Sequence, residues 1–364
     1  MTFPTSIHDL LDPLSGQRVS LRIERGALVE RAASLPSGTG RAIDGSNFWI
    51  LPALYDADAH MPLVDIGLRA SDAGVALHGG VARVNVALQW QDIVGFDLEA
   101  LVADLTRWAL PAVTPILSVH SDRDSAGFSA WLHEHADAVR ALLPPVCKLY
   151  SYGDGFWANL DTVFEHGLLP IIYCKELADV EAVVAKAPGP VHFRHAMTTE
   201  LVHTMRQLPG ATLQTSPHFL LPITDAVRAQ LHVLPPVPGD DVRRPFSELF
   251  LDEIDLLVTD HNAPPLGAQP GPGLQVQQWF LSAVLSICDL YGWPLEQVWR
   301  KATAAPAAHF GVSLGESFVI VDPTFEQAVG LWPTRQTPER APYLGMTLRG
   351  RVLGVGNEQA VELL

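Results

Sequence analysis

From Asn47 onward, short apolar runs alternate with longer segments that are amphipathic. Strands of a parallel sheet are buried on both faces and appear as continuous apolar runs, whereas the helices that cover them are amphipathic. The predicted strands are residues 49–56, 81–87, 113–119, 146–150, 170–174, 191–194, 211–215 and 256–259. The predicted helices are residues 97–110, 127–143, 177–186 and 200–208. We therefore expect an α/β fold, and this number of strands favours a closed (β/α)8 barrel of the TIM type over an open sheet.

Both ends of the chain show a different pattern, in which short alternating segments are separated by turns. The predicted strands of this kind are residues 19–23, 27–29, 318–321, 346–352 and 360–361. Alternation of apolar and polar residues is typical of antiparallel strands with one buried face. We therefore predict a small β domain built from residues 1–51 and 311–364, with the barrel, residues 52–310, inserted between its two parts.

Composition and charge narrow the class of protein. The 364 residues are 48% hydrophobic, which suffices for one large barrel with a small second domain. The formal charge of −16, with 24 scattered basic residues, argues against a nucleic acid as partner. No apolar stretch reaches the roughly 20 residues of a membrane-spanning helix, and the N-terminus lacks a signal-peptide pattern, so we expect a cytoplasmic protein. Three cysteines, Cys147, Cys174 and Cys288, are too few for a disulfide framework.

In a (β/α)8 barrel the reactive side chains lie at the carboxyl ends of the strands, so polar residues that end apolar runs are the first candidates. Alternate residues of a strand share a face, which lets Asp58 and His60 reach one metal ion. A polar exit from the strand explains these two residues equally well. Burial of Lys148 among apolar neighbours favours its neutral amine, which can form a carbamate ligand with carbon dioxide. Most lysines beside a strand instead extend their charged end to solvent.

Three further candidates end the fifth, sixth and final apolar runs. Cys174 ends the fifth run, and a cysteine is more often a small buried apolar residue than a ligand. His195 ends the sixth run, and a single histidine of this kind is more often a hydrogen-bonded buried residue. Asp260 ends the final run. It is interpreted either as a helix cap or loop anchor, or as a general base beside a metal-bound water. Taken together, the five strand ends predict one metal site.

The order and spacing of many short segments resemble the dihydroorotase branch of the amidohydrolase superfamily over nearly the whole chain. Three of these segments lie at strand ends: Lys148-Leu-Tyr150, His195-Ala-Met-Thr-Thr199 and Thr259-Asp-His261. The other matching segments are residues 9–16, 48–56, 215–221, 302–306, 319–323 and 342–352. The resemblance implies a cyclic amidohydrolase with the barrel and the small β domain described above.

The resemblance also implies two metal ions, usually zinc, held by an H-x-H pair, a carboxylated lysine, two further histidines and an aspartate. In that family a bridging hydroxide attacks the cyclic amide, and the aspartate passes the proton to the leaving nitrogen. Four positions match: His60, Lys148, His195 and Asp260. Asp58 and Cys174 replace the other two histidines, with Tyr173 as the alternative to Cys174 if the alignment differs by one residue. Aspartate and cysteine both bind zinc, but two extra anions lower the Lewis acidity of the metals and raise the pKa of bound water.

The residues that bind substrate in that family match this chain poorly. Pro62 stands in the position of the arginine that pairs with the substrate carboxylate, and Pro265 in the position of a histidine. A proline cannot reproduce the two parallel hydrogen bonds of an arginine to a carboxylate. The candidates left for substrate binding are Gln89, His218 and His261. A pocket for dihydroorotate is therefore not recognisable.

Two functions of different class follow from these matches. The first is a metal-dependent hydrolase of a cyclic amide C–N bond, which the matched ligands favour, with Asp260 as its catalytic base. The second is a non-catalytic homologue that keeps the barrel as a scaffold and assembles with aspartate transcarbamoylase, which the altered substrate pocket favours. The resemblance also implies a homodimer, the commonest symmetric assembly of soluble proteins.

Overall fold

The apolar runs in the middle of the chain form the parallel strands of one sheet. The computed structural model describes residues 5–36, 40–60, 73–121, 126–262, 272–332 and 336–364. In chain order the strands of this sheet are β6 (Leu54–His60), β7 (Val81–Gln89), β8 (Ala112–Val119), β9 (Val146–Tyr150), β10 (Leu169–Tyr173), β11 (His192–Phe193), β12 (Thr212–Thr215), β13 (Leu256–Leu257) and β14 (His261–Asn262). From β7 to β13, each strand pairs in parallel with the strand before it.

The sheet closes on itself through the segment that holds β13 and β14. β13 pairs with β12, and β14 pairs with β6, the first strand of the sheet. Residues 258–260 separate the two short strands, and Asp260, with a φ of 55°, turns the chain between them. β13 and β14 therefore act as one interrupted eighth strand, which confirms the predicted (β/α)8 barrel.

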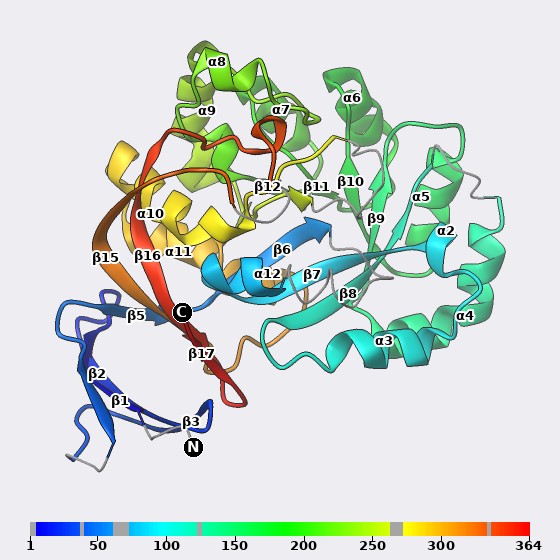
Figure 1. Ribbon diagram of the computed structural model, residues 1–364. Coiled ribbons are helices and arrows are strands. Elements are labelled where there is room, and N and C mark those ends of the chain that lie inside the picture. Colours follow the sequence, from blue (N-terminus) through cyan, green and yellow to red (C-terminus); the bar gives the residue numbers. More distant parts are fainter. Residues whose placement is uncertain (1–4, 37–39, 61–72, 122–125, 263–271, 333–335) are drawn as a thin grey trace.

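Helices cover the outside of the barrel (Figure 1). They are α2 (Trp90–Ile93), α3 (Leu98–Thr106), α4 (Phe128–Leu142), α5 (Phe156–Glu165), α6 (Leu177–Lys186), α7 (Thr199–Met205), α8 (Asp225–Arg228), α9 (Asp240–Glu253), α10 (Phe280–Tyr291), α11 (Leu295–Lys301) and α12 (Ala304–His309). Side-chain caps fix several of the starts: for example, Asp97 accepts a hydrogen bond from the backbone N–H of Ala100, and Thr198 accepts one from Leu201. Among the described helices, none is both long enough and apolar enough to cross a membrane.

Each barrel strand has an outer and an inner face, and the two faces belong to different clusters. Outward residues such as Leu149 pack under the helices in the main apolar core. Inward residues such as Val146 and Ile171 fill the lower layer of the barrel interior. Because side chains alternate along a strand, the next inward residues toward the carboxyl ends are Lys148 and Tyr173. The alternation that builds the core thus also directs polar side chains toward the mouth of the barrel.

Both ends of the chain form a second sheet beside the barrel, at lower left in Figure 1. Its strands are β1 (Thr5–Leu11), β2 (Arg18–Glu24), β3 (Ala27–Ala32), β4 (Arg41–Asp44), β5 (Trp49–Pro52), β15 (Phe318–Ala328), β16 (Thr347–Gly356) and β17 (Val361–Leu363). β5 and β15 join the two halves in antiparallel register, and Ile50 and Ile320 pack in its apolar core. This sheet confirms the predicted β domain from both termini, whereas the boundaries at 51 and 311 stay a prediction.

The run at residues 49–56, predicted as one strand, is two strands in different sheets. β5 belongs to the small sheet, and β6 begins the barrel. Pro52 has no N–H to continue a strand ladder, and the N–H of Ala53 bonds to the backbone oxygen of Ser317. The chain therefore leaves one sheet and enters the next within two residues, which an apolar run alone does not reveal.

Candidate functional site

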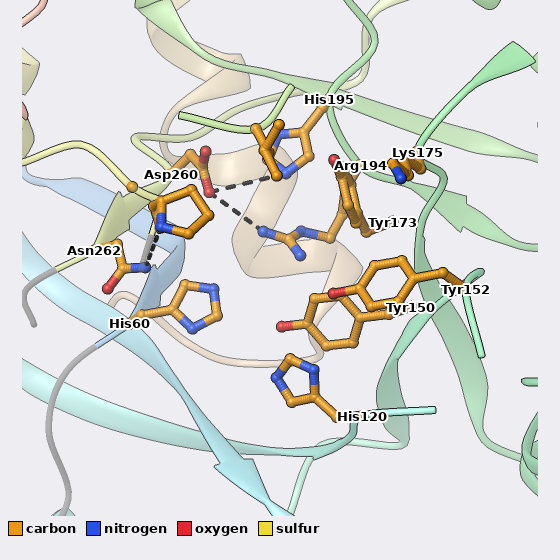
Figure 2. Close-up of a pocket in the computed structure, with 13 residues that line it drawn as sticks. His60, His120, Tyr150, Tyr152, Tyr173, Lys175, Arg194, His195, Asp260 and Asn262 are labelled. Atoms are coloured by element: carbon orange, nitrogen blue, oxygen red, sulfur yellow. Dashed lines mark hydrogen bonds and ion pairs between the residues drawn. The ribbon is translucent and has the colours of Figure 1, made fainter. Parts of the chain in front are cut away.

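A cavity of about 510 Å³ opens at the carboxyl ends of the barrel strands. Its lining residues are His60, His120, Tyr150, Tyr152, Tyr173, Lys175, Arg194, His195, Leu234, Asp260, Asn262, Pro272 and Gly273. Figure 2 shows aromatic rings on one side of the cavity, with His60, Asp260 and Asn262 on the other. This is the position at which barrel enzymes carry their active sites.

Asp58, on β6, lies at the centre of a buried network beneath this cavity. Its Oδ1 accepts a hydrogen bond of 2.6 Å from Lys148 Nζ. Its Oδ2 accepts one of 2.7 Å from Arg194 Nε and one of 2.6 Å from Gln214 Nε2. Burial opposes the charge of Asp58, but Arg194 and Lys148 hold its pKa well below its usual range. Both carboxylate oxygens are therefore occupied by strong donors.

Lys148 joins Asp58 to the second residue of the predicted pair. Its Nζ lies 2.9 Å from Nε2 of His60 as well as 2.6 Å from the carboxylate. Burial, together with the positive charges of Lys148 and Arg194, lowers the pKa of His60 well below its usual range. His60 is therefore neutral, with Nε2 accepting a hydrogen bond from the lysine.

Asp260 faces the same group from the turn between β13 and β14. Arg194 Nη2 donates to its Oδ1 at 3.3 Å, and His195 Nε2 lies 3.9 Å from the same oxygen. Burial raises the pKa of Asp260, and the nearby negative charge of Asp58 raises it further. His195 and Asp260 both have positive φ angles, 57° and 55°, which turn their side chains into the cavity. Non-glycine residues in this region are uncommon and concentrate at functional sites.

The structure brings five of the six predicted metal ligands together. Asp58, His60 and Asp260 offer ligand atoms within 4.8 Å of one another, so these three could hold a metal ion. Lys148 contacts two of the three, and His195 lies beside Asp260.

The structure places Cys174 away from this group. Its thiol lies near Ser151, outside the residues that line the cavity, and burial raises its pKa. Tyr173, the alternative from the sequence, does line the cavity, with its ring centroid 5.3 Å from that of His195. Alternation along β10 explains this, because Tyr173 shares the inward face of Ile171.

The three predicted substrate-binding residues are not among those that line the cavity. Gln89 ends β7, and His218 is fully buried with its ring 4.2 Å from that of Phe219. His261 Nδ1 accepts backbone hydrogen bonds from residues 276 and 277, which anchors the chain after β14. Pro62 and Pro265 lie outside the described residues.

Sequence reasoning missed Arg194 and the aromatic side of the cavity. The guanidinium of Arg194 lies 5.9 Å from the ring centroids of Tyr150 and Tyr173, within cation–π distance. His120 stacks on Tyr150 with centroids 4.0 Å apart and planes 10° apart. Side chains alternate between the inner and outer faces of a strand, and Arg194 lies two residues after His192, on the same inward face. This alternation is the sequence feature that indicates Arg194.

A two-metal carbamate centre, as the resemblance implies, does not fit these residues. Both oxygens of Asp58 already accept hydrogen bonds from two cations and an amide. Burial raises the pKa of Tyr173 to about 12, so the residue at the fifth strand end is a neutral phenol and not an anionic ligand. A carbamate on Lys148 would replace its ion pair with Asp58 by repulsion between two anions. The residues could still hold a single metal ion, bound by Asp58, His60 and Asp260.

No protein-family model and no curated protein matches this sequence. Solved structures do match. One is a D-hydantoinase with 16% identity and a TM-score of 0.75, over 100% of this chain and 95% of that one. Another is the dihydropyrimidinase of Brevibacillus agri NCHU1002, with 14% identity and a TM-score of 0.74, over 99% and 95%. A third is the dihydroorotase of Campylobacter jejuni, with 13% identity and a TM-score of 0.62, over 84% and 97%.

Identities this low establish the fold alone. Together with the closed barrel, the terminal β domain and the polar group at its mouth, they show that this divergent chain has the cyclic amidohydrolase fold of the hydantoinases and dihydroorotases.

Proposed function

We propose that this protein binds a small cyclic amide in the barrel-mouth cavity and does not hydrolyse it by the two-metal route. The observation that carries the proposal is the cavity itself, which sets a guanidinium and a carboxyl group against an aromatic surface. Its volume of about 510 Å³ falls within the range of small-molecule sites. The solved structures that share this fold include proteins named for hydantoin and dihydropyrimidine rings.

The lining residues offer what a cyclic amide needs, a flat surface and an edge of donors and acceptors. Tyr150, Tyr152 and Tyr173 present aromatic rings to one side of the cavity. Arg194 uses Nε and Nη2 for the two aspartates, and within the described residues Nη1 has no such bond, so it is available to a ring carbonyl. Asp260 lies across the cavity as a partner for a ring N–H.

Exclusion of the two-metal route rests on the state of the candidate ligands. A hydroxide held between two metals requires ligand atoms that are not committed elsewhere. Asp58 is committed to Lys148, Arg194 and Gln214, and the fifth strand end offers a neutral phenol. The proposal therefore assigns this chain to ligand binding.

A metal-dependent hydrolase that uses one ion is the second candidate function. The observation in its favour is the group of Asp58, His60 and Asp260, with ligand atoms within 4.8 Å of one another. In this candidate Asp260, the predicted catalytic base, also takes part in the metal site. Zinc as the metal and carboxylation of Lys148 stay predictions.

Assembly with aspartate transcarbamoylase and homodimer formation rest on the resemblance to dihydroorotases, and both stay predictions. They are tested by running the purified chain on a sizing column, alone and mixed with the transcarbamoylase. A shift of both proteins to one earlier peak supports the scaffold role, which is compatible with binding of a ring in the cavity.

Ligand binding is tested with the full chain and three rings: hydantoin, dihydrouracil and dihydroorotate. We expect at least one of them to raise the melting temperature and to give a saturable signal in calorimetry. The Tyr152→Ala variant removes part of the aromatic surface and is expected to weaken binding about tenfold. Phe96→Ala, at a residue 62% exposed and outside the cavity, is the matched control and should bind as the wild type does.

Chromatography of the same mixtures separates the two candidates. Recovery of intact ring after long incubation supports binding without hydrolysis. Ring-opened product that forms without a chelator, and does not form when a chelator is present, supports the hydrolase. Failure of all three rings to bind would remove the proposal.

A further inference from the structure

We propose that Lys148 and Arg194 take the place of two metal ions at the floor of the cavity, so that the site is assembled by the protein's own cations. The ammonium and the guanidinium each bridge two of the three candidate metal ligands, as metal ions would. This inference concerns the metal alone and does not depend on which ring the cavity binds.

The contacts show the bridging directly. Lys148 Nζ lies 2.6 Å from Asp58 and 2.9 Å from His60, so it joins the two residues of the predicted metal-binding pair. Arg194 lies 2.7 Å from Asp58 and 3.3 Å from Asp260, so it joins Asp58 to the third candidate ligand. Asp58 contacts both cations, as a bridging ligand contacts two metal ions.

The two cations pair with both carboxyl groups of the candidate metal site. Lys148 and Arg194 face Asp58, and Arg194 also faces Asp260. Lys148 is 1% exposed, and Asp58 and Arg194 are each 3% exposed, so water screens these charges little. A divalent ion placed at this group would meet two buried cations at short range and would have to displace at least one of them.

The identities of Asp58 and Arg194 are linked by this arrangement. A carboxylate offers two oxygens with several lone pairs, which lets Asp58 accept hydrogen bonds from a lysine, an arginine and Gln214 together. A histidine at the same place would offer one lone pair and no negative charge, and it would leave Arg194 partly unpaired. The aspartate in the H-x-H position and the arginine before His195 therefore act as one compensating pair.

The test is zinc binding by the purified full chain, measured without any ring ligand. We expect wild-type protein treated with a chelator and then titrated with zinc to bind no stoichiometric ion, and its melting temperature to be unchanged by chelator or zinc. Arg194→Ala removes one cation, takes away one of the two donors to Oδ2 of Asp58 and frees Oδ1 of Asp260, so its zinc affinity should rise about tenfold or more.

Arg206→Ala is the matched control, because Arg206 also bridges two carboxylates, those of Glu253 and Asp255, and none of the three lines the cavity. It should gain no zinc affinity. If Arg194→Ala does not fold, the wild-type titration and the Arg194→Lys variant, which keeps the charge and should also exclude zinc, decide the question. Labelling with ¹³C-bicarbonate should give no carbamate signal from Lys148.

Tight stoichiometric zinc in the wild type, or a carbamate signal, overturns the inference. Either result leaves the binding of a ring in the cavity to be judged by its own experiment. Conversely, a metal-free protein that binds no ring removes the proposed function and leaves this inference standing.

Discussion

Asp56 and Asp58 lie two residues apart on β6, both buried, and they are held by opposite kinds of partner. Asp56 accepts hydrogen bonds from neutral groups only: the N–H and hydroxyl of Thr259, the amide of Gln277 at 2.6 Å and the backbone N–H of Asp58 at 3.4 Å. Asp58 accepts hydrogen bonds from two cations and one amide. Burial raises the pKa of Asp56 to about 6, whereas the cations keep that of Asp58 well below its usual range.

The difference separates a structural position from a chemical one. Thr259 lies between β13 and β14, so Asp56 ties the interrupted eighth strand to the first strand and helps to close the barrel. Asp58, two residues nearer the mouth, gathers the charged side chains of Lys148 on β9 and of Arg194 directly after β11 into the floor of the cavity. Residue type alone does not distinguish the two aspartates, and only the charge of their partners does.

Replacement of Asp58 should have the largest effect on stability. Asp58→Asn keeps the shape of the side chain but leaves Lys148 and Arg194 as buried cations with one partner fewer. Breaking a buried ion pair from one side costs about 3–5 kcal/mol of unfolding free energy. Urea unfolding measures this loss. Asp137→Asn, which removes an exposed ion pair with Arg140, is the control and should cost below about 1 kcal/mol.

Replacement of Asp56 should cost less. Asp56→Asn replaces one carboxylate oxygen, an acceptor, by an NH₂ group that faces other donors. A buried hydrogen-bonding group left without a partner costs about 1–3 kcal/mol. No buried cation is left unpaired, which is the reason for the smaller loss. The same urea series measures it. An Asp56 variant as unstable as the Asp58 variant would show that charged partners are not what separates the two positions.

Acid should weaken the protein through the histidine that adjoins the Asp58 network. His192 contacts Gln214 at 2.8 Å, and Gln214 in turn donates to Asp58. Burial lowers the pKa of His192 from 6.5 to about 3. Below pH 6.5 the unfolded chain takes up a proton that the folded chain refuses, so this contribution to stability is complete above pH 6.5 and is lost as the pH falls toward 3.

The expected slope is about 1.4 kcal/mol of unfolding free energy per pH unit for this one group. Urea unfolding at pH 6.5 and pH 5.5 measures it, with His192→Gln as the variant that lacks the titrating ring. The wild type should lose about 1.0 kcal/mol more than the variant over this interval, because the unfolded ring is already half protonated at pH 6.5 and the full slope is reached only at lower pH. Equal losses in the two proteins would mean that His192 accepts its proton in the folded state.

The fold was predictable because the strands of a barrel are apolar on both faces. The run at 146–150 became β9 for that reason, and seven other predicted runs contain barrel strands. The second half of the eighth strand was not predictable, since His261 and Asn262 are polar and follow a left-handed residue, Asp260. Its place in the sheet depends on pairing with β6, some two hundred residues earlier, and no local pattern carries that information.

The candidate site was only partly predictable. Asp58, His60 and Asp260 were found because they end apolar runs, and the structure gathers them. Arg194 was missed because the candidates were the residues that end apolar runs, and His195 ends this run, although alternation from His192 indicates Arg194. Its pairing with Asp58 joins residues 136 positions apart, so it depends on the closed barrel.

The smallest effect is expected at Cys174, directly after β10. It sharpens the same comparison, because Tyr173 and Cys174 are neighbours that again differ in what they contact. Cys174→Ala should leave ring binding and zinc binding as in the wild type, because its thiol lies outside the cavity. Tyr173→Leu, one residue earlier, removes an aromatic ring from the cavity and should weaken ring binding. Calorimetry with the ring that binds wild type best compares the two variants. A larger loss at Cys174 than at Tyr173 would mean that the cysteine faces the site after all, and that β10 is shifted by one residue from the register that places Tyr173 beside His195.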